Sequence, residues 1–500
     1  MSLFAKKSIS KMLAQAADSD KGLKRTLGAW SLVTLGIGAI IGAGLFVRTA
    51  AAASEAAGPA VTLSFIVAAL GCAFAGLCYA EFASMIPIAG SAYAYSYVTM
   101  GEFVAWIIGW ALILEYALGA TTVSIAWSEY LNKLLNGAIP LQWCHSPFEG
   151  GIINLPAVII VFLLTVLLIR GMQESAMVNA IIVFVKVAIV LLFVGFGWQF
   201  INPANHTPYL IPATQAGHES FFKHGWGGVL GGAAIVFFAF IGFDAVSTAA
   251  QETKNPKRDM PIGIMGSLIV CTILYIVFGH VLTGVAKYTE FATAGKEASV
   301  AYAVQAHMHG YGWLATSITV AILAGFTSVI LVMLMGQSRV FYSMSNDGLI
   351  PKVFGSLHPK FKTPYKANWI LFIFVALFAA FVPGSVAGDL TSFGTLFAFA
   401  LVSIGVWILR VKEPNLERPF RAPFVPVVPI LGVIICLGMI VALDRQTLIV
   451  AFSWMVVGLI VYFIYSKKHS KVQKELKESG KENLKDSEME IISTLIDDFK

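Results

Sequence analysis

Residues 36–45 read GIGAIIGAGL, and this stretch lies inside a longer apolar run at 29–53. Four glycines within nine residues are too many for a stable uninterrupted helix, because each costs up to about 1 kcal/mol relative to alanine. A second apolar run, at 226–250, contains residues 237–244, which read FFAFIGFD and place a glycine and a carboxylate well inside it. We therefore predict two membrane helices that are broken near their middles.

The composition indicates that most of the chain lies in a membrane. Of its 500 residues, 57% are hydrophobic and only 12% are charged, whereas soluble domains carry about 25% charged residues. A spanning helix needs roughly 20 mostly apolar residues. Such runs recur at 29–53, 58–82, 100–128, 153–170, 176–200, 226–250, 262–286, 313–343, 367–383, 388–409, 424–443 and 447–466. The alternating pattern of a membrane barrel is absent from them, so the predicted fold is all-α: a polytopic membrane protein with twelve transmembrane helices.

The net charge of +6 predicts the orientation of the protein. On the twelve-helix arrangement, most of the 34 Lys and Arg residues fall on the side that carries both tails. Positively charged loops mark the cytoplasmic face, so we predict that both termini are cytoplasmic. We also predict a multi-pass protein of the plasma membrane, which is the inner membrane in a bacterial cell. The basic excess is thereby explained without a nucleic-acid partner.

The two tails differ in composition from the transporter domain predicted at 29–466. Residues 1–28 mix Lys with apolar residues at helical spacing, which predicts a cytoplasmic tail with an interfacial helix. Residues 467–500 are strongly charged and lack a core-forming pattern, which predicts a charged cytoplasmic tail.

The two broken runs are five spans apart, so they are expected to cross the membrane in opposite senses. Interrupted helices paired in this way are typical of inverted-repeat transporters, whose substrate site lies between them. A break frees N–H groups that bind a carboxylate and carbonyls that bind an ammonium group. An α-amino acid carries both groups on one carbon. The other interpretation is that the glycines only allow close helix packing.

Four stretches carry a resemblance to a known family. They are residues 38–46, 87–97, 238–244 with 252–256, and 336–339. On these, and over about 25–465, the chain resembles the amino acid–polyamine–organocation superfamily and, within it, the cationic amino acid transporter family in its shorter, bacterial-like twelve-helix form. The resemblance implies a five-plus-five inverted repeat at about 29–200 and 226–409, with peripheral helices at 424–466.

The resemblance also implies a substrate site on the two breaks. The predicted substrate-binding residues are Ile40, Ile41, Gly42, Ala43, Gly44, Glu115, Phe238, Ala239 and Ile241. The N–H groups of Gly42, Ala43 and Gly44 would bind the carboxylate. The ammonium group would face the carbonyls of Ile40, Phe238, Ala239 and Ile241. Phe238 matches an aromatic gate that closes over the substrate, and the alternative for its ring is ordinary packing.

Lys186 lies inside the run at 176–200, where a charge costs at least about 2.5 kcal/mol. The resemblance supplies a reason, because some proton-coupled members carry a lysine here that contacts the first broken helix. Lys186 is therefore our candidate for proton coupling. The alternative is a fixed ammonium group that only braces helix carbonyls. Thr327 and Ser328 resemble the hydroxyl pair of sodium-coupled relatives, which makes sodium the weaker interpretation.

Three further charges fall within or near predicted spans. Glu115 either lines the side-chain pocket of the substrate or is a protonated carboxyl bonded to a neighbouring helix. Asp244 follows the second break, and we favour a structural hydrogen bond over a weaker role in proton coupling. Arg48 is either an interface anchor or part of an outer gate.

The sequence predicts a transporter and not an enzyme. No catalytic motif, metal-binding spacing or nucleotide-binding segment is found, so we expect no catalytic residue, no metal and no cofactor, with a proton gradient as the driving force. The expected partners are an L-amino acid, protons and the lipid bilayer, and a small membrane subunit or lipid at the periphery stays open. We expect proton-coupled symport, by alternating access, of cationic or small neutral amino acids such as alanine. The alternatives are an exchanger without net proton coupling and an amino acid sensor.

Overall fold

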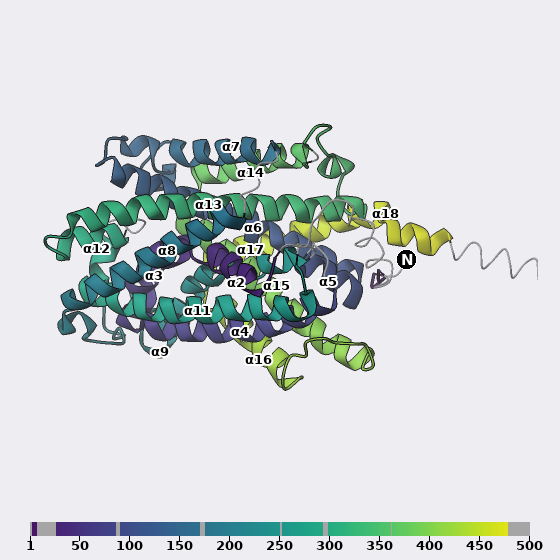
Figure 1. Ribbon diagram of the computed structural model, residues 1–500, viewed down its shortest axis with the longest axis horizontal. Coiled ribbons are helices and arrows are strands. Elements are labelled where there is room, and N and C mark those ends of the chain that lie inside the picture. Colours follow the sequence, from purple (N-terminus) through teal and green to yellow (C-terminus); the bar gives the residue numbers. More distant parts are fainter. Residues whose placement is uncertain are drawn as a thin grey trace, which may run out of the picture.

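The computed structural model describes residues 3–7, 27–86, 91–170, 176–250, 253–293, 299–361 and 363–478. Helices dominate these residues, and an isolated bridge between Leu27 and Thr253 stands beside them. The helices run mainly along the long axis of the molecule (Figure 1). α5 and α18 lie toward one end of this axis and α12 toward the other.

The long helices follow the apolar runs of the sequence. They are α2 (Ala29–Ile40), α4 (Val61–Met85), α6 (Glu102–Leu134), α7 (Leu155–Ile169), α8 (Ala176–Gly197), α9 (Gly225–Val236), α11 (Pro256–Val285), α13 (Gly312–Asn346), α14 (Tyr365–Phe381), α15 (Gly384–Lys412), α16 (Val427–Val441) and α17 (Arg445–Val461). The short helices are α3 (Thr49–Ala52), α5 (Ser91–Thr99), α10 (Ala245–Thr248), α12 (Ser299–His307) and α18 (Lys467–His469).

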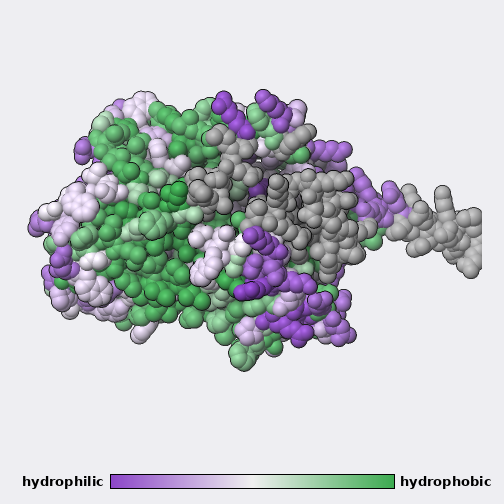
Figure 2. All heavy atoms as spheres, viewed as in Figure 1, coloured by the Kyte–Doolittle hydropathy of each residue, from purple (hydrophilic) through white to green (hydrophobic). Residues whose placement is uncertain are grey.

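Eight helical segments within the described ranges are long and apolar enough to cross a membrane, and four shorter apolar helices accompany them. Figure 2 shows the face of the molecule that is viewed in Figure 1. Hydrophobic residues form a broad band over it, and hydrophilic residues gather toward the two ends of the long axis. Large apolar side chains such as Phe184, Ile273 and Ile434 are exposed on the long helices, which suits contact with lipid. The all-α polytopic class is confirmed, whereas the count of twelve spans and the inverted repeat stay predictions.

Eight of the long helices fall into two packing groups, and α8 and α15 contact members of both. One group consists of α2, α4, α9 and α11, with α11 in contact with both α2 and α4. The other consists of α6, α7, α13 and α14, which contact one another. In Figure 1, α7 and α14 lie along one edge and α2 lies near the centre of the view. The helices that lead into the two breaks, α2 and α9, therefore belong to the same group.

Some predicted features fall on residues outside the described ranges. The interfacial helix was predicted on a tail of which residues 8–26 are not described, and the same holds for residues 479–500 of the charged tail and for 87–90 and 252 of the family motifs. Residues 3–7 are not helical, and the Ala5 carbonyl accepts a hydrogen bond of 2.9 Å from the Glu102 N–H at the start of α6.

Candidate functional site

The first break begins where α2 ends at Ile40. Ile41 has an extended backbone with ψ of 102°, and the chain resumes as a π-helical segment at Gly44–Arg48. A Cβ atom added at Gly44 would lie 2.1 Å from the Cα atom of Ala239, in the segment that follows α9. Only glycine allows this approach, so the two broken helices touch at this point.

The second break follows a 3₁₀ turn at Phe237–Phe240. Gly242 has a φ of +116°, in a region that residues with a side chain rarely adopt. A Cβ atom there would also lie 2.9 Å from the Ala39 carbonyl oxygen. The two breaks therefore meet at two glycines, one in each helix.

The carbonyls at the end of α2 are bound by side chains from two other helices. Lys186 of α8 is only 2% exposed, and its Nζ atom donates to the Gly38 carbonyl over 2.8 Å. The Tyr275 hydroxyl of α11 lies 3.0 Å from the Ile40 carbonyl oxygen and 2.9 Å from that of Ala239. A hydroxyl has one proton, so it can donate to only one of these two carbonyls at a time.

Tyr275 was missed in the sequence. The available signal was a hydroxyl in the apolar run at 262–286, which needs a partner in a membrane. Of the four carbonyls predicted to face the ammonium group, Phe238 already accepts a 3.3 Å hydrogen bond from the Ile241 N–H. The Phe238 side chain is buried, on the turn that leads into the second break.

The N–H groups of Gly42, Ala43 and Gly44 stand at the start of the second half of the broken helix. Gly42 carries the carbonyl that accepts from the Leu45 and Phe46 N–H groups. The first N–H groups of a helix have no acceptor within it and form its positive end. This end and the carbonyl end of α2 are separated by Ile41 and Gly42.

The chain matches, over residues 27–465, the sequence model of a family described as amino acid permease. It belongs to the amino acid permease family. This membership confirms the predicted superfamily and a transporter class, in place of an enzyme.

Individual relatives of this permease differ in substrate. It is 46% identical to the branched-chain amino acid permease BcaP of Bacillus subtilis, over 94% of this chain and 99% of the relative. It is 43% identical to a methylthioribose transporter of the same organism, over 95% of this chain and 100% of the relative. It is 33% identical to the vacuolar cationic amino acid transporter 4 of Arabidopsis thaliana, over 83% of this chain and 68% of the relative.

Two buried carboxyls of the permease, those of Glu115 and Asp244, lie together next to the second break. Asp244 accepts a 2.6 Å hydrogen bond from the Tyr116 hydroxyl of α6, and the neighbouring Glu115 carboxyl lies beside it. Both carboxyls are fully buried. A side-chain hydrogen bond joins the Glu115 carboxyl to that of Asp244.

Arg48 of the permease forms an ion pair with Asp389 of α15. Because Arg48 is 4% exposed and ties the segment after the first break to a different helix, its position favours a gate over an interface anchor. Asp389 was missed in the sequence, where a carboxylate at the start of a predicted span was the available signal. The Thr327 hydroxyl donates to the Leu323 carbonyl within α13, over 2.8 Å.

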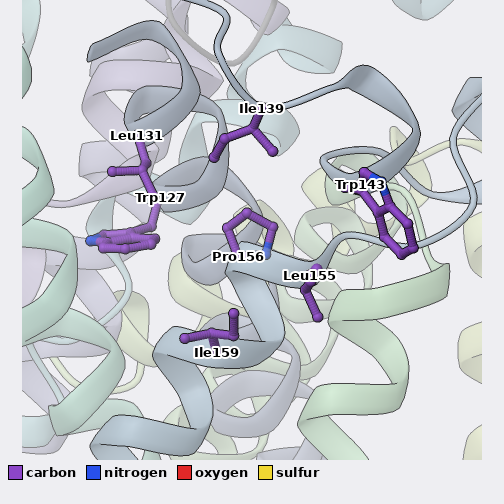
Figure 3. Close-up of a pocket in the computed structure, with 7 residues that line it drawn as sticks. All are labelled: Trp127, Leu131, Ile139, Trp143, Leu155, Pro156 and Ile159. Atoms are coloured by element: carbon purple, nitrogen blue, oxygen red, sulfur yellow. The ribbon is translucent and has the colours of Figure 1, made fainter. Parts of the chain in front are cut away.

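A pocket of about 420 Å³ lies away from the breaks, between the end of α6 and the start of α7 (Figure 3). It is lined by Trp127, Leu131, Ile139, Trp143, Leu155, Pro156 and Ile159. This lining offers no charged group, so the pocket lacks the chemistry to bind an amino acid backbone. The part of the chain that the structure describes also holds no cluster of three metal-binding side chains.

Proposed function

We propose that this permease is a proton-coupled symporter that carries neutral aliphatic L-amino acids, small or branched, by alternating access. It would act in the plasma membrane, with twelve spans in a five-plus-five inverted repeat and both termini in the cytoplasm. It needs no cofactor, because the proton gradient drives transport. The observation that carries the proposal is the contact of the two breaks at Gly44 and Ala239.

Substrate recognition would use the backbone of both breaks. The carboxylate would bind the N–H groups of Gly42, Ala43 and Gly44, with Ile41 beside them. The ammonium group would bind the carbonyls near Ile40, Ala239 and Ile241. The shared Tyr275 hydroxyl supports this, because one of its two carbonyls always needs another donor. Phe238, buried next to the break, would close the site.

Lys186 would couple transport to protons. A charged ammonium group forms a stronger hydrogen bond with a carbonyl than a neutral amine does, and it also suits the negative end of α2. Loss of the proton would therefore weaken the hold of Lys186 on Gly38 and loosen the first break. Asp244 is a weaker candidate for the same task, since Tyr116 holds one of its oxygens.

Alternating access would move one packing group against the other. Both breaks belong to the group of α2, α4, α9 and α11, whereas α6, α7, α13 and α14 would form the scaffold. The ion pair between Arg48 and Asp389 would open when the outer side of the first helix moves away from α15.

The relatives and the buried Glu115 carboxyl point to different kinds of substrate side chain. The high identity to a branched-chain permease over nearly the whole length favours aliphatic side chains. A second candidate is a cationic amino acid, because the carboxyls of Glu115 and Asp244 are both buried in the protein and would attract a cationic group. The methylthioribose relative adds a substrate class without carboxylate or ammonium group.

A ligand panel on purified protein in liposomes tests the proposal. It compares L-leucine, L-valine, L-alanine, L-arginine, L-lysine and methylthioribose, first by thermal stabilisation at pH 5 to 8 and then by uptake. We expect neutral aliphatic amino acids to accumulate only when the outside is acidic. Accumulation of arginine alone would favour the cationic alternative. A counterflow rate that is the same with and without a pH gradient would indicate an exchanger. Binding without any uptake would indicate a sensor.

A further inference from the structure

Gly325 lies where α13 crosses Lys186. A Cβ atom added at Gly325 would lie 2.7 Å from the Cε atom of Lys186, 3.3 Å from its Cγ atom and 3.5 Å from its Cδ atom. Lys186 comes from α8, which packs on both α2 and α13. The methylene chain of the lysine therefore lies directly against a position of α13 that has no side chain to block it.

Close helix packing does not explain this glycine. At Gly44 the nearest atom to an added Cβ is a backbone atom of the facing segment, as expected where two backbones approach. At Gly325 all three nearest atoms belong to the side chain of Lys186. The space that the missing side chain leaves is thus occupied by the lysine and not by a neighbouring backbone.

The ammonium end of Lys186 has little freedom to move. It donates to the Gly38 carbonyl over 2.8 Å, and the side chain is buried. A methyl group at position 325 would have to displace Cε, which is bonded to Nζ. A shift of about 1 Å would lengthen the hydrogen bond beyond its usual limit of about 3.2 Å.

The same face of α13 also contacts the other side of the first break. Val329 lies four residues after Gly325 and therefore on the same helix face. An added Cβ at Gly42 would lie 3.2 Å from a methyl group of Val329. One helix face thus contacts both the lysine that binds the carbonyl end of the break and the residue that begins its N–H end.

We propose that Gly325 is a positioning residue for proton coupling: its missing side chain lets Lys186 lie across α13 and reach the Gly38 carbonyl. The inference rests on the proposed coupling role of Lys186. It gives α13 a role in the coupling between protonation of Lys186 and the geometry of the first break. The proposed substrate contacts do not require this role.

The test compares Gly325→Ala with Gly195→Ala, a control in α8 where an added Cβ meets nothing within 4 Å. Two rates are measured in liposomes: accumulation driven by a pH gradient, and counterflow without a gradient. We expect Gly325→Ala to lower accumulation about tenfold, the effect of losing one charged hydrogen bond, and to keep counterflow within about twofold of the control. Accumulation equal to that of the control would overturn the inference.

A double-mutant cycle with Lys186→Met separates positioning from packing. If Gly325 acts through the lysine, Gly325→Ala has no further effect in the Lys186→Met background. A loss that multiplies in the double variant would show a general packing role and overturn the inference. Undiminished accumulation by Lys186→Met alone would instead overturn the coupling role itself.

Folding is measured in parallel, by the elution profile and melting temperature of each variant. Should Gly325→Ala fail to fold, we expect Lys186→Met to restore folding in the double variant, because the flexible methionine is not held at Gly38. A double variant that also fails to fold would contradict the inference.

Discussion

The two breaks touch one another, yet they are built from different parts. The first is shaped by close approach, since Gly44 faces the backbone of Ala239, and its carbonyls are bound by side chains from distant helices. The second is shaped by its own backbone, since Gly242 has a φ of +116°. The first break can therefore respond to a change in its partners, such as protonation of Lys186, whereas the geometry of the second is set locally.

The largest expected effect comes from Gly44→Ala, which tests the contact between the breaks. The new Cβ atom would lie 2.1 Å from the Cα atom of Ala239, and two backbones would have to separate. We expect substrate binding to weaken by at least about a hundredfold, as for severe overpacking of a few kcal/mol. Isothermal titration measures this, with Gly438→Ala as a control because an added Cβ there meets nothing within 4 Å. Affinity close to the control would show that the breaks are not in contact.

A smaller but still large loss is expected for Gly242→Ala, which tests whether the second break is set locally. Alanine is strained at this φ by about 1–2 kcal/mol, and its Cβ would approach the Ala39 carbonyl oxygen. We expect a lower melting temperature and about tenfold slower uptake. The effect should persist in a Tyr275→Phe background, because the backbone strain at Gly242 does not depend on the hydroxyl that binds the Ala239 carbonyl. Suppression by that second change would argue against a locally set break.

Tyr275→Phe tests whether the first break depends on its partners. Loss of the hydroxyl leaves the Ile40 and Ala239 carbonyls without this donor, and a buried unsatisfied acceptor costs about 1–3 kcal/mol. We expect the free protein to melt earlier, while added substrate stabilises the variant more than the parent, because its ammonium group replaces the lost donor. A substrate-induced shift smaller than that of the parent would contradict this explanation.

The smallest expected effect belongs to Tyr116→Phe, beside the second break. It removes one hydrogen bond to Asp244, worth about 1 kcal/mol, without changing the backbone of the break. We expect a slightly lower melting temperature and uptake within about threefold of the parent. A loss as large as that of Gly242→Ala would mean that the carboxyl, and not the backbone, maintains the second break.

Glycine density and local pattern made the broken helices predictable. The break predicted in the run at 36–45 contains both the end of α2 at Ile40 and Gly44, whereas the contact of Gly44 with Ala239 was not predicted. Lys186 was also predictable, since a charge inside an apolar run demands a partner. The short helix α5 was not predicted, because it lies between two spans, where no hydrophobic periodicity marks it.

The partners of the breaks could not be found in the same way. Tyr275, Asp389 and Gly325 lie against Ile40, Arg48 and Lys186, respectively, each more than 100 positions away in the chain. Which helix face meets which neighbour depends on the rotation of each helix, and hydropathy does not fix that rotation in a membrane. Phe238 shows a further limit, since its carbonyl is used within a 3₁₀ turn that the sequence did not reveal.

The most direct measurement is the binding of three matched ligands to the purified permease. They are the amino acid that stabilises it most in the panel, the methyl ester of that amino acid and its deaminated acid. Because a site built from hydrogen bonds rejects analogues that leave its groups unpaired, we expect each analogue to bind at least about a hundredfold more weakly. An ester or acid that binds within about tenfold of the amino acid would contradict recognition by the backbone of both breaks.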